Sequence, residues 1–200
     1  MPELPEVERA RALIEEHALE RRIAAVDDRD TYVCRPFAPG EIAAALEGRR
    51  LLAAHRRGKS MWCDTDGGPV LGLHLGMAGR IVIAAPGGEG ATEAGDPKPA
   101  RDGRGWDRFR LDFDDGGFLV LRDKRRLSRA VLDPDLGHLG PDAAEVDRET
   151  FRARVGRGTA PLKARIMDQS VIAGVGNLLA DETLWQARLS PLRPAEDLDA

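Results

Sequence analysis

The first six residues, MPELPE, bring together groups that could do chemistry at the end of the chain. Methionine aminopeptidase removes an initiator methionine when the next residue is small, so we expect Met1 to be cleaved off. The nitrogen of Pro2 then becomes a free secondary amine. An α-amino group has a pKa of roughly 8, so part of it is neutral at pH 7. Such an amine can attack C1′ of a sugar and form a Schiff base, here a permanently cationic iminium. Glu3 could donate a proton to the opening sugar, and Glu6 lies on the same helical face.

A simpler interpretation competes with this one. A proline and two acids also favour the start of a helix, because proline fits the first turn and carboxylates favour its positive end. The MPELPE segment alone does not separate the two interpretations, so other motifs must decide.

Two glycine-containing motifs follow in the middle of the chain. In RRGKSMW, Lys59 is expected at the start of a strand, where it could bind a phosphate or shuttle a proton. The alternative is a solvated edge-strand lysine. In HLGMAGR, His74 could donate to a phosphate and Met77 could be an exposed apolar wedge. The alternative is an internally bonded histidine and a core methionine.

Two later segments have compositions that suit nucleic-acid phosphates. RDKRRLSR is a basic loop with one apolar residue, Leu127. Its basic residues could bind phosphates while the apolar side chain inserts into the base stack. In DQSVIAGVGN, Gly174 and Gly176 permit a tight turn and Asn177 is expected to cap the next helix. A helix that starts after such a turn can bind phosphate, and Lys163 adds positive charge. An ordinary helix-turn-helix would show the same pattern.

Short elements must position these motifs. Helical spacing in EVERARALIEEHAL places Val7, Ala10 and Ile14 on one face. Strand-like runs then alternate with turns: RIAAV, RRLLAAH, SMWCD, PVLGLHL, RIVIAA, FRLDF, FLVLR and SRAVL. A two-residue turn at Gly67 and Gly68 is predicted to join one pair, and the DGG segment another. So many short strands indicate a β-sandwich or barrel.

A change in composition and periodicity along the chain predicts two domains. Residues 85–105 are rich in Gly, Pro and Ala, and we predict a flexible surface insertion there that is not part of the core. Near Pro141 helical spacing takes over, in RETFRARV, PLKARIM and NLLADETLWQA. The sequence therefore predicts an α+β fold, with an N-terminal helix and a β-sandwich in residues 1–140 and a helical domain in residues 141–200.

The motifs PELPEVE, RGK, HLGMAG, D-x-R-R and DQSVIAGVGNxxADE occur here in that order. Together they resemble the formamidopyrimidine-DNA glycosylase and endonuclease VIII family of base-excision enzymes, and PELPEVE favours the formamidopyrimidine branch. The resemblance covers nearly all 200 residues. It implies a catalytic β-sandwich domain, a helix–two-turn–helix DNA-binding domain, and damaged double-stranded DNA as the partner.

Residue by residue, the resemblance implies a nucleophile at Pro2 and a proton donor at Glu3. It implies that Glu6 supports the site and that Lys59 acts in β-elimination and contacts a phosphate. Further residues would contact DNA, either at its phosphates or in the gap left by the flipped nucleotide: His74, Met77, Arg108, Arg125, Leu127, Lys163 and Asn177.

The chain departs from the family pattern in three places. Leu127 stands where phenylalanine is usual, and Trp106 and Arg108 stand where histidines are common. Leucine fills less space, so we expect altered discrimination of the opposite base. The family's C-terminal zinc finger has no counterpart before the end of the chain. The chain is therefore expected to be either a truncated fragment or a shortened relative, and the ending PAEDLDA suggests truncation. The family's zinc is structural and its ligands would lie in the absent finger, so we expect no metal within this chain. The implied chemistry also needs no cofactor.

The activity implied by the resemblance is a bifunctional DNA glycosylase and abasic-site lyase that excises oxidised purines such as 8-oxoguanine and formamidopyrimidines. Two alternatives stay open. One is excision of oxidised pyrimidines in the manner of endonuclease VIII. The other is a non-catalytic relative that recognises lesions or abasic sites without cutting the strand.

Composition sets outer limits on these interpretations. A hydrophobic content of 42% and a charged content of 32% are ordinary for a globular protein, and no apolar stretch is long enough for a membrane span. Cys34 and Cys63 are isolated, so neither a disulfide framework nor a zinc site is predicted. We expect a monomer in a reducing, bacterial-type cytoplasm, associated with the nucleoid.

The net charge of −4 argues against a nucleic-acid partner when taken as an average. However, basic residues cluster in residues 49–59 and 122–129, and local positive stripes can still form a phosphate footprint. Solvated charged strands and turns are the alternative interpretation of the same clusters.

Overall fold

The computed structural model describes residues 2–88, 90–95 and 104–198, and its contacts divide the chain into two units. The first unit comprises Met1–Arg56 and Ser60–Pro134, and the second comprises Arg57–Lys59 and Asp135–Ala200. The boundary predicted near Pro141 therefore lies inside the second unit. Residues just before Pro141 already contact this unit: the N–H of Gly140 donates to the carbonyl of Gln169 at 2.8 Å.

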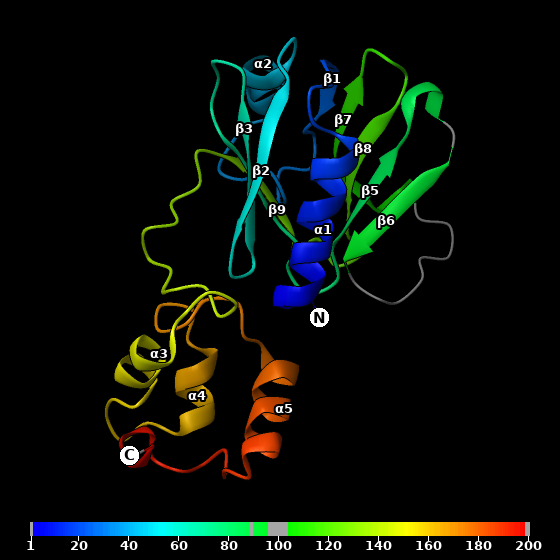
Figure 1. The fold of residues 1–200 in the computed structure, drawn as a ribbon. Coiled ribbons are helices and arrows are strands. Elements are labelled where there is room, and N and C mark those ends of the chain that lie inside the picture. The colour runs from blue at the N-terminus through cyan, green and yellow to red at the C-terminus, as the bar shows by residue number, and fades with distance from the viewer. Residues whose placement is uncertain (1, 89, 96–103, 199–200) are drawn as a thin grey trace. The chain divides into compact units, whose positions relative to one another are not determined.

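The first unit consists of helix α1 (Leu4–His17) beside two antiparallel sheets (Figure 1). A short helix, α2 (Glu41–Leu46), follows the first strand. The five-stranded sheet has the order β1-β7-β8-β5-β6 and contains β1 (Ile23–Asp27), β5 (Arg80–Ala84), β6 (Ala91–Gly95), β7 (Asp107–Phe113) and β8 (Phe118–Arg122). The four-stranded sheet has the order β2-β3-β4-β9 and contains β2 (Leu51–Arg57), β3 (Ser60–Thr65), β4 (Leu71–His74) and β9 (Arg129–Leu132).

The core of this unit follows from alternation along the strands. Every second residue of β3, beginning at Met61, is buried, and the same holds for β7 from Phe109. Successive side chains point to opposite faces of a strand, so each sheet turns one apolar face inward. Helix α1 contacts β5 and β6 of one sheet and β3 of the other, and it buries Val7, Ala10 and Ile14 as predicted. The predicted α+β fold is confirmed.

The prediction of a non-core insertion over residues 85–105 is wrong for residues 91–95. These residues form the edge strand β6, which pairs with β5 from Ala84↔Ala91 to Arg80↔Gly95, and Ala94 is buried in the core. A segment without apolar periodicity becomes a strand here because β5 supplies its backbone partners. Residues 96–103 of the predicted insertion lie outside the described residues.

Two smaller features also differ from the prediction. Strand β3 ends at Thr65 and β4 begins at Leu71, so residues 66–70 form a longer loop than the predicted two-residue turn. The hydroxyl of Thr65 donates to the carbonyl of Pro69 at 2.8 Å and closes this loop. Helix α2 was not predicted; its first N–H groups are capped by the distant carboxylate of Asp28, a contact that local sequence does not reveal.

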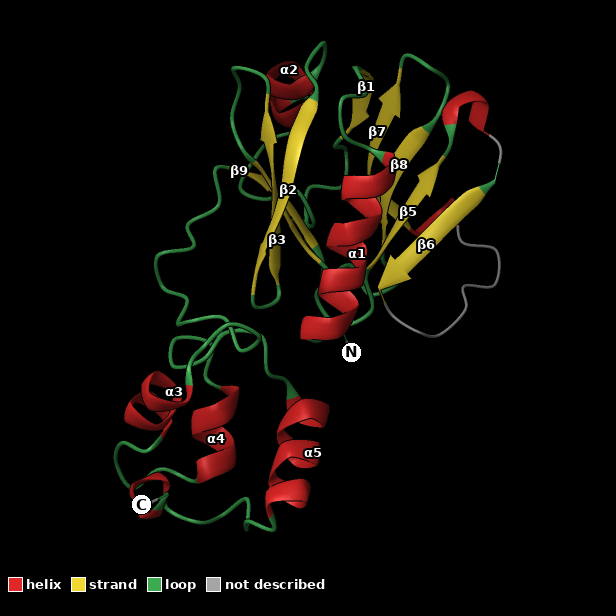
Figure 2. Cartoon of the chain, in the orientation of Figure 1, coloured by secondary structure: helices red, strands yellow, loops and turns green. Residues whose placement is uncertain are grey.

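The second unit contains α3 (Arg148–Val155), α4 (Leu162–Met167) and α5 (Asn177–Ala187), which confirm the three predicted helices (Figure 2). Asp147 caps α3 by accepting from the N–H of Thr150 at 2.8 Å. The helices share a separate apolar core that includes Leu162, Ile172 and Leu184. Within the described ranges, no helix is both long and apolar enough to cross a membrane.

Burial of the two cysteines leads to a prediction about their reactivity. Burial raises the pKa of the Cys34 and Cys63 thiols to about 12, and the nearby carboxylate of Asp28 adds to the effect at Cys34. Because the thiolate is the reactive form, neither cysteine should be alkylated by iodoacetamide in the folded protein at mildly alkaline pH. Mass spectrometry should find both alkylated in denaturant, and rapid alkylation of either one in the native protein would contradict the placement.

Candidate active site

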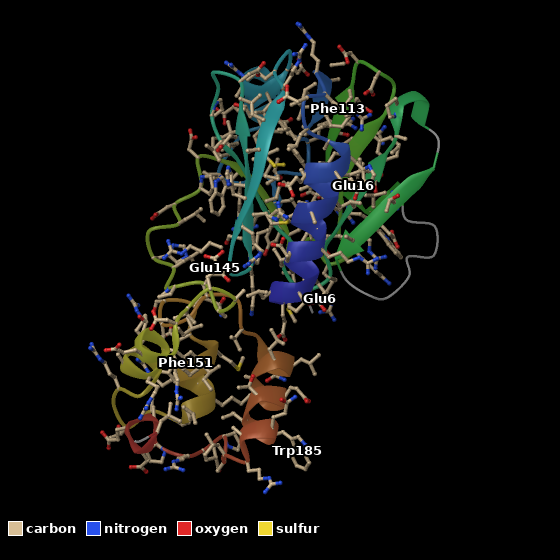
Figure 3. The ribbon with its side chains drawn as sticks, in the orientation of Figure 1. Glu6, Glu16, Phe113, Glu145, Phe151 and Trp185 are labelled. Carbon is tan, nitrogen blue, oxygen red and sulfur yellow. The ribbon has the colours of Figure 1, made fainter. Side chains whose placement is uncertain are left out.

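Helix α1 begins with a reciprocal pair of hydrogen bonds between Glu3 and Glu6. The N–H of Glu3 donates to the carboxylate of Glu6 at 2.9 Å, and the Glu3 carboxylate accepts from the N–H of Glu6. This is a capping box, with Glu3 at the N-cap and Pro5 at the second helical position. Glu6 marks the N-terminal end of the helix in Figure 3. The simpler interpretation, a helix start, therefore accounts for both acids and for Pro5.

Pro2 directly precedes the N-cap and is buried. An apolar residue at this position commonly packs against the first turn of the helix. The Glu3 side chain beside it is only 3% exposed. Burying a carboxyl group costs free energy unless it is hydrogen-bonded, and the capping box supplies part of that compensation. The result is that the nitrogen of Pro2 and a carboxyl group are held next to each other near the start of the chain.

A charged network ties this helix to β2. The Glu8 carboxylate accepts from Nε of Arg11 and from Nε of Arg56, each at 2.8 Å. Arg11 also donates to the carbonyl of Ala54 at 3.2 Å. Burial alone would raise the pKa of Glu8, but the two guanidinium groups outweigh it and hold the pKa below its ordinary value. These contacts keep the N-terminal helix fixed against the strand.

Lys59 lies in the turn between β2 and β3, one residue before β3 begins, and not at the strand start that the sequence predicts. Gly58 occupies the first turn position with φ +60°, where glycine is favoured in tight hairpins. A side chain at Gly58 would come within 2.7 Å of the Cβ of Ala173, so only glycine permits this approach. The N–H of Gly58 donates to the buried carboxylate of Asp142 at 2.6 Å. The turn that carries Lys59 is therefore held within the second unit.

His74 ends β4 and has a defined tautomer. Its Nδ1 accepts from the N–H of Gly76 at 3.0 Å, which places the proton of the neutral ring on Nε2. That nitrogen is then a donor, as a phosphate contact requires. Across the sheet, His74 pairs with Ser60 on one side and Arg129 on the other.

Met77 and Leu127 sit on two loops that pack backbone to backbone. A Cβ at Gly76 would lie 2.4 Å from the carbonyl oxygen of Leu127, so the loops can approach only because this residue is glycine. Met77 is 44% exposed and Leu127 is 40% exposed, so neither is a core residue. The structure thus brings two exposed apolar side chains onto adjoining loops.

The loop of residues 123–128, called the wedge loop below, is organised by a buried aspartate. The Asp123 carboxylate accepts from the N–H groups of Arg125 at 2.8 Å, Leu127 at 2.7 Å and Ser128 at 2.8 Å. Arg125 is exposed. Asp123 is the first residue of the D-x-R-R motif, but the motif alone does not show this role; the available signal was an aspartate at the start of a polar loop, where its side chain can bond nearby backbone N–H groups.

Two arginines, Arg108 outside the wedge loop and Arg126 within it, connect the loop to Asp30. Arg108 donates through Nε to the carbonyl of Asp123 at 2.7 Å, and its other end lies 3.8 Å from the carboxylate of Asp30. Arg126 makes a two-pronged ion pair with the same carboxylate, at 2.7 and 2.9 Å. The described partners of Arg108 are thus internal, and they give it a positioning role in the loop. Its predicted contact with DNA stays a prediction.

In the second unit, a glutamine side chain holds the glycine turn before α5. Oε1 of Gln169 accepts from the N–H of Gly174 at 3.0 Å, and its Nε2 donates to the carbonyl of Val175 at 2.9 Å. Gly174 has φ +116°, a conformation that favours glycine. Gln169 lies inside the DQSVIAGVG motif, but its role depends on a fold of the chain that the motif alone does not show.

The prediction that Asn177 caps α5 is wrong. Gly176 is the N-cap and Asn177 is the first helical residue, because Gly176 has the extended backbone that a cap requires. Asn177 instead points along the helix to Asp181, at 3.5 Å. Lys163 pairs with the same carboxylate at 2.6 Å. Asp181, which the sequence did not single out, therefore links the two predicted phosphate contacts of this unit.

The described residues do not fit a zinc site. No three His, Cys, Asp or Glu side chains in this part of the chain cluster as metal ligands would. Cys34 and Cys63 are buried on separate segments, in a loop and in β3.

Comparison with known proteins decides the family. The model of the formamidopyrimidine-DNA glycosylase N-terminal domain matches residues 1–130, and the model of the formamidopyrimidine-DNA glycosylase H2TH domain matches residues 139–200. A formamidopyrimidine-DNA glycosylase of Nocardioides is 39% identical over the whole chain, which covers 68% of that protein. This chain belongs to the formamidopyrimidine-DNA glycosylase family.

Other relatives agree with this membership. A formamidopyrimidine-DNA glycosylase of Arabidopsis thaliana is 34% identical over 99% of this chain, which spans 53% of that protein's length. Among solved structures, Lactococcus lactis Fpg in complex with abasic-site DNA superposes with a TM-score of 0.80 at 24% identity, covering 98% of this chain and 71% of that one. The MutM protein in complex with DNA containing carbocyclic 8-oxo-G gives a TM-score of 0.81 at 25% identity, covering 99% and 72%.

For this member of the family, Asp123→Asn tests the role of the buried carboxylate. Both carboxylate oxygens accept backbone N–H groups, so an amide must turn its NH₂ toward at least one donor. We expect the free energy of unfolding to fall by about 1–3 kcal/mol in urea denaturation. Asp114→Asn, at an exposed position in the turn between β7 and β8, is the matched control and should change it little. Equal stability of the two variants would refute the organising role.

Proposed function

We propose that this chain is a bifunctional DNA glycosylase and abasic-site lyase that excises oxidised purines from duplex DNA. Its relatives are named formamidopyrimidine-DNA glycosylase, and the solved structures of similar fold include complexes with abasic-site and carbocyclic 8-oxo-G DNA. The observation that carries the proposal is Pro2, buried ahead of the helix cap and adjacent to the buried Glu3.

The proposed reaction begins at the chain end. With Met1 removed, the lone pair of the Pro2 nitrogen attacks C1′ of the flipped nucleotide, and the bond from C1′ to the damaged base breaks. The base leaves with the bonding electrons and takes up the proton that the Pro2 nitrogen releases. Glu3 donates its proton to O4′ as the sugar ring opens, leaving an iminium between Pro2 and C1′.

Strand cleavage follows from the charge on the iminium. The cationic nitrogen draws electrons from C1′ and acidifies C2′, so loss of a C2′ proton expels the 3′ phosphate by β-elimination. A second elimination expels the 5′ phosphate, and water then hydrolyses the iminium to free Pro2. We assign Lys59 to proton transfer in β-elimination and to contact with a neighbouring phosphate; the Gly58–Asp142 bond fixes its turn.

Damaged DNA would be held through phosphates and opened by apolar side chains. We assign phosphate contacts to Lys59, His74, Arg125, Lys163 and Asn177. The exposed Met77 and Leu127, with Arg125, would fill the gap left by the flipped nucleotide. Extrusion costs least for a damaged or mispaired base, which contributes to selectivity.

The nucleophile is tested by reductive trapping. Sodium borohydride should cross-link the mature protein to DNA that contains an abasic site, and peptide mapping should find the adduct at Pro2, because only an N-terminal proline offers a secondary amine. A protein with an uncleaved N-terminal tag is the matched control and should not be trapped. Normal trapping of the tagged protein would place the nucleophile on a lysine instead.

The substrate class is tested with duplexes that contain 8-oxoguanine, a formamidopyrimidine or an oxidised pyrimidine. We expect the purine lesions to be excised first. Excision of the pyrimidine lesions alone would favour the endonuclease VIII-like alternative, and excision of no lesion would favour the non-catalytic one.

Glu3→Gln separates the two chemical steps. A glutamine side chain still accepts from the N–H of Glu6, so the capping box survives while the proton is lost. We expect base excision to fall by about 10²–10⁴-fold, the usual contribution of a general acid. Cutting of a preformed abasic site should fall far less, since no base has to leave. Equal loss in both assays would indicate a collapsed site and not a missing proton donor.

A further inference from the structure

An exposed tyrosine, Tyr32, is contacted by three arginines, one of which belongs to the wedge loop. Tyr32 is 46% exposed, and the guanidinium carbon of Arg35 stacks 4.0 Å above the centroid of its ring. Arg126 approaches the same ring at 5.8 Å. The backbone carbonyl of Tyr32 accepts from Arg35 and, at 3.2 Å, from Arg129. Tyr32, Arg35 and Arg129 are called the Tyr32 patch below.

The charges of this patch are not balanced. Arg126 is matched by Asp30 through its two-pronged ion pair. Arg35 and Arg129 form no ion pair with any carboxylate in the part of the chain that the structure describes. Burial and the positive charge of Arg35 both lower the pKa of Arg129. Two guanidinium groups directed at one carbonyl repel each other, and an anion placed between them would relieve that repulsion.

The patch is continuous with the proposed DNA contacts of the first unit. Arg129 is the cross-strand partner of His74 between β9 and β4. The neighbouring pair, Ala130 and Leu73, is buried, so His74 and Arg129 share the outer face of the sheet. The N–H of Ala130 donates to the carbonyl of Val33 at 3.2 Å, which fixes the Tyr32 segment along the edge of β9.

We propose that Arg35 and Arg129, held by Tyr32, bind phosphodiester groups of the DNA duplex in addition to those contacted by Lys59, His74 and Arg125. The proposal rests on the proposed function, because it takes duplex DNA as the partner. Stacking on Tyr32 restricts Arg35 before binding, so little conformational entropy is lost when its guanidinium meets a phosphate. The wedge loop adjoins the patch through Arg126, so a duplex that receives Leu127 would run past both arginines.

Salt dependence of binding measures these contacts directly. Each phosphate neutralised by a cation contributes roughly −0.9 to the slope of log K against log salt. The cations Lys59, Arg125 and Lys163 alone predict a slope of about −2.7, and the two patch arginines bring it to about −4.5. The probe is a short duplex with a tetrahydrofuran abasic analogue, titrated by fluorescence anisotropy at several potassium chloride concentrations.

Four variants of the full chain test the proposal. Arg35→Gln with Arg129→Gln should make the slope shallower by about 1.8, and the corresponding double lysine variant should restore most of it. Arg29→Gln is the matched control, because Arg29 lies in the same segment, is 82% exposed and is already paired with Asp27 at 2.6 Å; its slope should equal that of the wild type. If the double glutamine variant does not fold, Arg35→Gln alone should give a change of about 0.9.

The outcomes separate this proposal from the catalytic one. A wild-type slope in the folded glutamine variants would overturn the patch, since the arginines would then serve only to hold the Tyr32 segment. Wild-type protein that does not bind the duplex even at low salt would also overturn it. Borohydride trapping of the wild type is measured separately, on a duplex of the same sequence with a natural abasic site, because the tetrahydrofuran analogue lacks the C1′ hydroxyl and forms no Schiff base. If the slope changes as expected but the wild type traps nothing, the patch stands and the proposed chemistry fails.

Discussion

The capping box between Glu3 and Glu6 is the interaction on which the candidate site depends. Chain ends usually fray, because few contacts oppose their conformational freedom. Here the first turn of α1 is closed by two reciprocal hydrogen bonds, and Val7 and Ala10 bury its inner face immediately afterwards. Glu8 then ties the helix to β2 through Arg56. A terminal amine can serve as a positioned nucleophile only if the helix behind it is immobilised in this way.

The loops around the site are built on a common physical principle. Buried carboxylates hold backbone N–H groups: Asp123 organises the wedge loop and Asp142 holds the turn of Lys59. Glycines allow the close backbone approaches, as Gly76 does against Leu127. Exposed side chains such as Met77 are therefore carried on loops whose backbone is already fixed. Preorganised loops of this kind lose little entropy when they engage a ligand.

The charge distribution reconciles an acidic protein with a polyanionic partner. Several cations near the proposed interface are paired with carboxylates at rest, as Lys163 is with Asp181 and Arg126 with Asp30. Such pairs are exchangeable for phosphate where they are exposed, since surface ion pairs contribute little net stability. The Tyr32 patch differs because both of its arginines donate to the same Tyr32 carbonyl, and no ion pair of either one is described. Local arrangement of charge, and not the net value of −4, decides what the surface can bind.

The sequence by itself determined the α+β fold, most strands and helices, the family, and the candidate nucleophile, because each depends on local periodicity or on motif order. It did not reveal that residues 91–95 form an edge strand, since that strand exists through its pairing with β5. Nor did it show that Gly176, and not Asn177, caps α5. The roles of Asp123, Gln169 and Asp181 and the grouping of Arg35 with Arg129 were decided by tertiary structure alone. Each depends on a buried hydrogen bond, a shared carboxylate or a cross-strand neighbour, and such contacts exist only once segments distant in sequence have packed together.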